Sequence, residues 1–296
     1  MAVSDHVTIL RSGKSVEFLK TTETTEKELA TLMVGYEIDM TLERKKVEKG
    51  ETILSLQNVR LLPQAEKTVD LEIRAGEILG IAGVEGNGQQ QLEEMIMGLE
   101  KVKCGKIFFK QEEITGMSVK ERCKRGIGYI PSDRYKRAIL PGFSLKDNYL
   151  LGNQYKDSYA RKGMLNQEYI EKKTKELMEK FDVRAVNGDQ LIGALSGGNQ
   201  QKLVLSREVD KDPDLILACQ PVRGLDIGAI KFIHNVLLEL RNQGKAVLLI
   251  SAELSDLFQL SDRIGVLYKG EMMSLQETEK YTTESISLLM AGKKGG

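Results

Sequence analysis

A short apolar run that leads into a glycine-rich loop constrains the fold of this chain most strongly. Residues 78–82 read Ile-Leu-Gly-Ile-Ala, the loop after them contains Gly83, Gly86 and Gly88, and an amphipathic pattern then extends to Met97. Such an uninterrupted apolar run is typical of a strand buried on both faces of a sheet. A glycine loop between a strand and a helix gathers backbone N–H groups at the helix start, which suits a bound phosphate.

Further apolar runs alternate with helical patterns along the chain. Strands are predicted at 127–130, 215–221 and 246–251, and helices follow the last two, at 227–241 and from 252 onward. This alternation predicts an α/β fold with a mainly parallel sheet. The patterns at 53–59 and 68–73 predict two more strands. Helices predicted at 143–151 and 167–181 indicate a helical insertion covering about 117–186.

The glycine loop lacks the side chains that usually hold a nucleotide. A P-loop continues with a lysine, which reaches the β- and γ-phosphates, and with a serine or threonine, which holds Mg²⁺. Gln89 and Gln90 occupy these positions here, and Glu85 adds a negative charge inside the loop. We therefore expect the shape of a phosphate cradle with much of its attraction removed.

A second candidate anion site begins at Ser196. Residues 195–202 read Leu-Ser-Gly-Gly-Asn-Gln-Gln-Lys, and a regular apolar pattern extends to Val209. Serine is a good N-cap, and Gly197 and Gly198 let the backbone approach a ligand closely. The free N–H groups and the positive end of the helix dipole suit a phosphate. An ordinary serine-capped helix is the alternative interpretation of this stretch taken alone.

Composition excludes several classes of protein. Lys and Arg number 43 against 43 Asp and Glu, and tryptophan is absent, so nucleic acid is not expected as a partner. Three widely spaced cysteines indicate reduced thiols and neither a disulfide framework nor a zinc site. Apolar runs fall short of the roughly 18 residues of a membrane span, and no signal-peptide pattern opens the chain. Any role at a membrane is expected to come through a partner.

The beginning of the chain is similar to a stretch near its end. Residues 4–14 correspond to 261–271, and 32–35 correspond to 289–292, at a constant spacing of 257 residues (from 4 to 261). This spacing is too long for a solenoid and indicates a domain-sized duplication. We interpret 1–35 as the tail of a preceding domain, 36–51 as a charged linker, and 52–296 as a second domain. Chance similarity between two short strand–turn–strand units is the alternative.

The order and spacing of these motifs resemble the nucleotide-binding domain of ABC transporters, from about Thr52 to Gly296. Three groups of residues match that family: the P-loop glycines Gly83, Gly86 and Gly88; the signature residues Ser196, Gly197, Gly198 and Gln200; and the D-loop at 224–226, with Asp226. Asn199 departs from the commonest signature. Together with residues 223–226 and the duplication, it resembles the second half of the ATPase subunits of simple-sugar and nucleoside importers.

This resemblance implies a P-loop NTPase-like fold with an antiparallel β subdomain. It also implies two such domains packed head to tail, with ATP and Mg²⁺ between the P-loop of one and the signature of the other. Transmembrane permease subunits, and indirectly a solute-binding protein, would be the partners. The chain would then lie at the cytoplasmic face of the membrane.

The positions that carry catalysis in the family are all changed here. The strand that normally ends in Asp-Glu ends in Cys219 and Gln220, the switch histidine is Ala252, and the loop residue that senses Mg²⁺ is Ser132. Residues 61–67 also lack the aromatic side chain that stacks on adenine. A thiol is a poor ligand for Mg²⁺, and glutamine cannot act as a carboxylate base. We expect no intact catalytic residue and no metal held by this chain's own site.

These departures favour an asymmetric pair of domains. The chain would supply its signature to ATP held by the preceding domain, while its own site hydrolyses little or nothing. A non-catalytic regulatory or scaffolding module is the first alternative. A soluble ABC protein of translation or DNA repair is the second, but the extended basic linkers or long coiled coils that such proteins need are not visible in the sequence.

Overall fold

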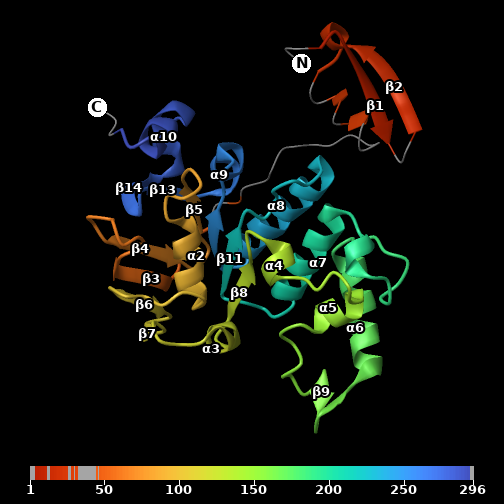
Figure 1. Ribbon diagram of the computed structural model, residues 1–296, viewed down its shortest axis with the longest axis horizontal. Helices are drawn as coiled ribbons and strands as arrows, with labels where there is room; N and C mark the ends of the chain where they lie inside the picture. The colour runs from red at the N-terminus through yellow and green to blue at the C-terminus, as the bar shows by residue number, and fades with distance from the viewer. Residues whose placement is uncertain are drawn as a thin grey trace.

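A six-stranded sheet forms the centre of the protein (Figure 1). The computed structural model describes residues 4–11, 14–25, 28–29, 31–32, 45 and 47–293. The strand order is β14-β13-β5-β12-β11-β8, with all neighbours parallel except the antiparallel edge strand β14. The strands are β5 (Ile78–Ala82), β8 (Ile127–Ile130), β11 (Leu215–Cys219), β12 (Ala246–Ile250), β13 (Arg263–Tyr268) and β14 (Glu271–Glu277).

The three central strands β5, β12 and β11 are buried along their whole length, because both faces of the sheet are covered. Side chains alternate between two apolar clusters: Val247 and Leu249 of β12 face one, and Leu248 faces the other. The first cluster lies under α7 (Gly197–Val209), α8 (Ile227–Asn242) and α9 (Leu254–Leu260). The second lies under α2 (Gln89–Met97). Figure 1 shows α2 and α8 on opposite sides of the sheet.

A second, antiparallel sheet completes the cover on the α2 side. Its order is β4-β3-β6-β7, with β3 (Thr52–Val59), β4 (Val69–Arg74), β6 (Lys106–Phe109) and β7 (Glu112–Glu113). Strict alternation of buried and exposed residues along β4 reflects one face packed on the core and one face in water. The predicted α/β fold with a mainly parallel sheet and an antiparallel β subdomain is confirmed.

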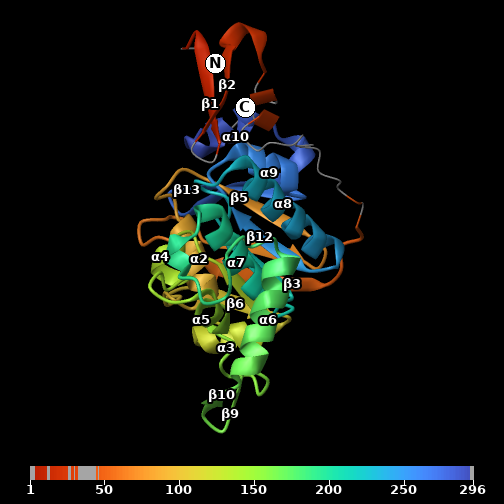
Figure 2. The same cartoon turned by 90° about the vertical axis from the view of Figure 1, so that its right-hand side faces the viewer.

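A helical part follows β8. It contains α4 (Arg134–Arg137), α5 (Leu145–Leu150), the small hairpin β9 (Ala160–Arg161) and β10 (Met164–Leu165), and α6 (Gln167–Lys180). Both views place the β9–β10 hairpin at its outer tip (Figure 2). The segment predicted as an insertion, about 117–186, also holds α3 (Val119–Lys124) and β8, and β8 pairs with β11 in the main sheet.

The helix predicted from 143 starts later because Ser144 caps it. The Ser144 hydroxyl accepts the backbone N–H of Asp147, and the Asp147 carboxylate accepts the backbone N–H of Ser144. This reciprocal capping box sets the first helical residue at Leu145. The hydrogen bonding of two polar side chains therefore defines the boundary that hydrophobic periodicity missed.

The N-terminal hairpin has the same register as the β13–β14 hairpin. Strand β1 (His6–Arg11) pairs with β2 (Lys14–Lys20), and each of the six residue pairs recurs 257 positions later in β13–β14. The β-bulge falls between Ile9 and Leu10 in the first copy and between Val266 and Leu267 in the second. A 3-10 turn then follows both copies, η1 (Thr21–Glu23) and η3 (Thr278–Lys280).

The two hairpins differ in what covers them. Strand β13 pairs in parallel with β5, and Leu267 is 0% exposed. Among the described strands β1 pairs with β2 alone, and the equivalent Leu10 is 68% exposed. Phe18 is 66% exposed in the same hairpin.

Of the predicted linker 36–51, the structure describes residues 45 and 47–51. Within the described residues, no helix is both long and apolar enough to span a bilayer.

Candidate functional site

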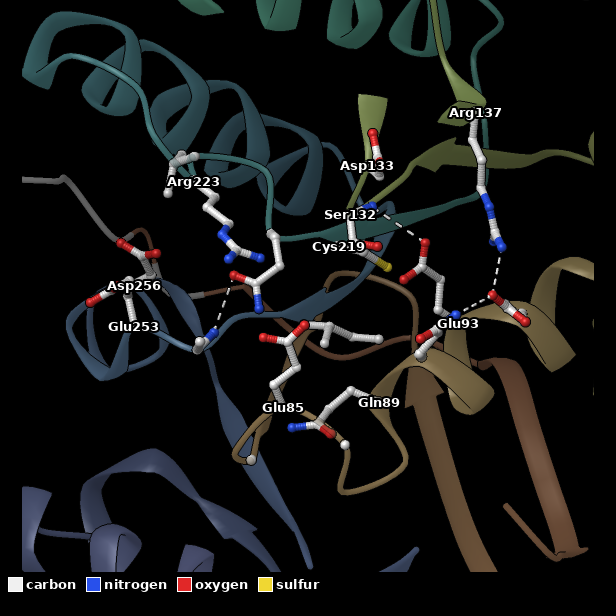
Figure 3. A pocket seen from close by; sticks show the side chains of 18 of the residues that line it. Glu85, Gln89, Glu93, Ser132, Asp133, Arg137, Cys219, Arg223, Glu253 and Asp256 are labelled. Atoms are coloured by element: carbon white, nitrogen blue, oxygen red, sulfur yellow. Dashed lines mark hydrogen bonds and ion pairs between the residues drawn. The ribbon is translucent and has the colours of Figure 1, made fainter. Parts of the chain in front are cut away.

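A cavity of about 510 Å³ opens at the carboxyl ends of the central parallel strands (Figure 3). Ligand sites of parallel α/β sheets form at this edge. The loops after β5, β8, β11 and β12 and one side of α2 enclose it. Its lining includes these residues of the nucleotide site expected from the sequence: Gly83, Glu85, Gly86, Gln89, Gln90, Ser132, Cys219, Gln220 and Ala252. Folding therefore brings together all but Gly88 of the residues that the sequence singled out for this chain's own nucleotide site.

Glycines with left-handed backbone shape the loop between β5 and α2. Gly86 and Gly88 have φ angles of 90° and 108°, in the region that favours glycine. Asn87 holds the loop to the β13–β14 turn, since its carbonyl accepts the N–H of Gly270 at 2.9 Å and its Oδ1 accepts the N–H of Lys269 at 2.9 Å. These two hydrogen bonds hold the loop in place without the usual lysine.

Gln89 turns its side chain into the loop. Its Nε2 donates to the carbonyl of Val84 at 3.1 Å, and its Oε1 is buried without a hydrogen-bond partner among the described residues. A β-carbon at Gly83 would clash with this amide. The space under the loop is thus occupied by a neutral group, and the buried Oε1 is an acceptor that a phosphate oxygen cannot satisfy.

Gln220 is used to join two strand ends. It has a φ of 48°, its N–H donates to the carbonyl of Ile250 at 2.7 Å, and its Oε1 accepts the N–H of Ala252 at 3.3 Å. The residues in the places of the catalytic glutamate and the switch histidine therefore bond to each other. Neither offers a base for the activation of water.

A buried polar cluster forms the floor of the cavity. Glu93 is 3% exposed, and its Oε1 accepts the Tyr129 hydroxyl at 2.5 Å and the backbone N–H of Ser132 at 3.3 Å. Burial, and next the negative charge of Glu93, raise the pKa of the Cys219 thiol well above its usual value. They also raise the pKa of the Tyr129 hydroxyl. Cys219 therefore stays a neutral thiol, which disfavours its use as a metal ligand.

The charges around the cavity oppose a nucleotide. Six carboxyl side chains line it against three cationic ones. One of the cations, Arg137, already pairs with Glu94 at 2.5 Å. A magnesium triphosphate would bring further negative charge, and it would find Gln89 in the place of the P-loop lysine and Cys219 in the place of the strand-end aspartate. The residues present do not fit this group, so we derive no hydrolytic step through this cavity.

The signature stretch has a different environment. Ser196 is exposed and caps the 13-residue helix α7, since its Oγ accepts the N–H of Asn199 at 3.4 Å. A β-carbon at Gly198 would lie 2.9 Å from Cβ of Ala229, so the glycine permits close packing of α7 on α8. Within the described chain, residues 196–200 are not part of the cavity lining.

Two further predicted signature and D-loop residues have structural partners. Gln200 is 1% exposed, its Oε1 accepts Nε of Arg134 at 3.2 Å, and its Nε2 donates to the carbonyls of Ile192 and Leu195 at 3.3 and 3.2 Å. Asp226 caps α8, because its Oδ1 accepts the N–H of Ala229 at 2.9 Å. Gln200 therefore fixes the first turn of α7, and Asp226 fixes the first turn of α8.

Comparison with known proteins identifies the family of the chain. The ABC transporter family profile matches residues 66–223. The chain belongs to the ABC transporter family. The cassette fold agrees with this: TM-scores are 0.64 to a nucleotide-free ATP-binding cassette from an ABC transporter, at 21% identity over 81% of this chain and 96% of that one. The TM-score is 0.65 to a dimeric post-hydrolysis cassette bound to ADP and Pi, at 23% identity over 77% of this chain and 100% of that chain.

Curated relatives of this ABC cassette are longer proteins. The guanosine import ATP-binding protein NupO of Bacillus subtilis (strain 168) is 40% identical over 294 residues, which are 98% of this chain and 58% of NupO. The nucleoside import ATP-binding protein NupA of Lactococcus lactis subsp. cremoris is 37% identical over 98% of this chain and 58% of NupA. The ribose import ATP-binding protein RbsA of Clostridium tetani is 35% identical over 96% of this chain and 56% of RbsA. The chain thus spans little more than half the length of these relatives.

Several side chains of the cassette's cavity were not singled out from the sequence. They are Glu93, Glu94, Arg137 and Asp256. A signal existed for the first two: they are acids in the middle of a short helix, between Leu92 and Met95, which are 0% and 3% exposed. An acid that shares the buried side of a helix requires a hydrogen-bonding partner from elsewhere in the fold.

Proposed function

We propose that this chain is the second cassette of the ATP-binding subunit of an ABC importer for nucleosides or sugars. It presents its signature helix to ATP and Mg²⁺ held by a preceding cassette, while its own cavity hydrolyses little or no ATP. The nucleoside and ribose import for which NupO, NupA and RbsA are named supports the class of transported solute. Permease subunits at the cytoplasmic face of the membrane, and indirectly a solute-binding protein, would be the partners.

The observation that carries this proposal is the contrast between the two faces of the cassette. The cavity has a neutral amide under its glycine loop and an excess of carboxyl groups. The start of α7, in contrast, is exposed and capped by Ser196, and the first turn of a helix leaves N–H groups that lack intrahelical acceptors. Those groups suit a triphosphate carried by another domain.

The N-terminal hairpin supports a preceding cassette. It repeats the register and the bulge of β13–β14, whose β13 is covered by β5 in this cassette. Exposed Leu10 and Phe18 would be covered by the equivalent strand of another cassette. We therefore assign 1–35 to the end of that cassette, 36–51 to the linker, and 52–296 to the second cassette.

The test joins this chain to a preceding cassette with an intact P-loop and measures ATP turnover. Ser196→Arg should abolish turnover, because it places a bulky side chain where backbone N–H groups meet the γ-phosphate. Ser118→Arg is the matched control, since Ser118 is also an exposed serine N-cap, on α3. Full turnover with Ser196→Arg would contradict signature donation and leave a scaffolding role.

A separate measurement addresses the chain's own cavity. The chain alone should show no Mg²⁺-dependent ATP turnover above background. Turnover that Gln220→Ala removes would contradict the proposal that this site is degenerate.

A further inference from the structure

We propose that Glu93, Glu94 and Arg137 are positioning residues that clamp the loop 131–137 onto α2 without a bound nucleotide. Through Arg134, the clamp sets the start of the signature helix α7. The value of this arrangement to transport rests on the proposed function, but the clamp itself is a property of this chain alone.

Two adjacent acids of α2 contact the same loop, and Figure 3 shows Glu93 beside Ser132. Glu93 accepts the Ser132 N–H at 3.3 Å and the Tyr129 hydroxyl at 2.5 Å. Glu94 accepts Nη2 of Arg137 at 2.5 Å, and Nη1 of Arg137 donates to the Tyr129 hydroxyl at 3.4 Å. The carboxyl pair and the guanidinium therefore hold both ends of residues 132–137 to the helix that follows the glycine loop.

The clamp lies where water competes weakly. The side chains of Glu94 and Arg137 are 14% and 21% exposed. Burial acts to raise the pKa of Glu94, but its hydrogen bonds to Gln90 and Arg137 outweigh burial and lower that pKa. Hydrogen bonds between ionised groups are stronger than neutral ones and gain strength in a low-dielectric setting. The contacts therefore suffice to order the loop without a metal ion.

The loop also contacts both ends of α7. Arg134 donates to Gln200 at 3.2 Å, and a β-carbon at Gly197 would lie 2.9 Å from its Nη2. At the other end, Nη1 of Arg207 donates to the carbonyl of Ala138 at 2.9 Å, directly after α4. A single helical turn thus links α2 with the signature helix through hydrogen bonds that involve no ligand.

The consequence is a signature orientation that does not depend on the chain's own cavity. In a site that binds Mg²⁺ through this loop, the loop would order when the metal nucleotide arrives. Here Glu93 accepts the Ser132 N–H and Glu94 pairs with Arg137, so these contacts exist before any nucleotide binds. The cassette would present Ser196 and its glycines in one position whether or not its own cavity holds a ligand.

Hydrogen exchange of the full chain, with and without ATP and Mg²⁺, tests this clamp. In the wild-type chain, amides of 132–139 should be protected and should not change on addition of the nucleotide. Arg137→Met and Glu94→Gln should each speed exchange in 132–139 and 199–201 by roughly tenfold, the scale of one lost charged hydrogen bond. Exchange in α6 should stay unchanged, which separates loss of the clamp from general destabilisation.

The matched control is Arg125→Met, which breaks the bidentate pair with Glu112, at 2.8 Å for both bonds, outside the clamp. It should leave both segments as in the wild type. Added protection of 132–139 by Mg²⁺-ATP in the wild type, or unchanged exchange in both clamp variants, would overturn the inference. Either result leaves the Ser196→Arg experiment intact, so failure of the clamp and failure of signature donation can be told apart.

Discussion

The thiol of Cys219, at the end of β11, lies beside the carboxyl group of Glu93 on α2 (Figure 3). Cys219 is 0% exposed and Glu93 is 3% exposed. The ABC pattern places an aspartate at position 219, whereas here the carboxyl group at this spot comes from a helix. Two carboxylates could not both be ionised in so small a buried space.

This relationship predicts that restoring the aspartate will destabilise the protein. Cys219→Asp should lower the free energy of unfolding by about 2–4 kcal/mol, because it buries a second acid beside Glu93. Glu93→Gln should recover much of this loss in the double variant. Urea unfolding of the four members of the cycle measures the coupling, and additive effects of the two substitutions would contradict it.

The two equivalent leucines of the repeated hairpins should respond differently to truncation. Leu267→Ala should cost about 2–5 kcal/mol, since it empties a fully buried position. Leu10→Ala should stay within about 0.5 kcal/mol, as expected for an exposed side chain. Thermal unfolding of the two variants makes the comparison. A large loss with Leu10→Ala would mean that this chain already buries that hairpin face.

Close packing of α7 on α8 predicts the effect of a methyl group at Gly198. Gly198→Ala should destabilise the fold by about 1–3 kcal/mol, because the new β-carbon would lie 2.9 Å from Cβ of Ala229. Gly142→Ala is the control, since no described atom lies within 4 Å of its β-carbon position. Chemical denaturation distinguishes the two, and equal stabilities would show that α7 can shift to admit the methyl group.

Glu208 should make stability depend on pH. Burial acts to raise its pKa, but Lys211 and Arg207 outweigh burial and lower the pKa below its usual 4.5. Both Glu208 oxygens accept Nζ of Lys211 at 2.8 Å. A lowered pKa stabilises the folded state above about pH 4.5, and this contribution disappears as the pH falls through the folded-state value.

Urea unfolding of the wild type and Glu208→Gln between pH 7 and about pH 3 checks this sign. The variant should be less stable by about 1–3 kcal/mol at pH 7, and the difference should shrink in acid. A difference that is constant with pH would rule out the ion pair as its source.

Much of the architecture follows from local patterns. The strands predicted at 78–82 and 127–130 match β5 and β8, and the helix predicted from 227 matches the start of α8. An apolar run flanked by turns can be recognised without knowing its neighbours. The similarity between the two strand–turn–strand stretches was visible for the same reason, and their hairpins share one register and one bulge position.

The hydrogen-bond partners of the cavity's polar side chains could not be predicted from such local patterns. The sequence indicates only which side chains Gln89 and Gln220 replace, whereas in the fold one fills the loop and the other joins two strand ends. Glu93 meets Tyr129 across 36 residues of sequence, and Arg134 meets Gln200 across 66. Periodicity records which side of an element is buried. The partner of a buried polar group depends on how distant elements pack, and only the folded chain brings those groups within hydrogen-bonding distance.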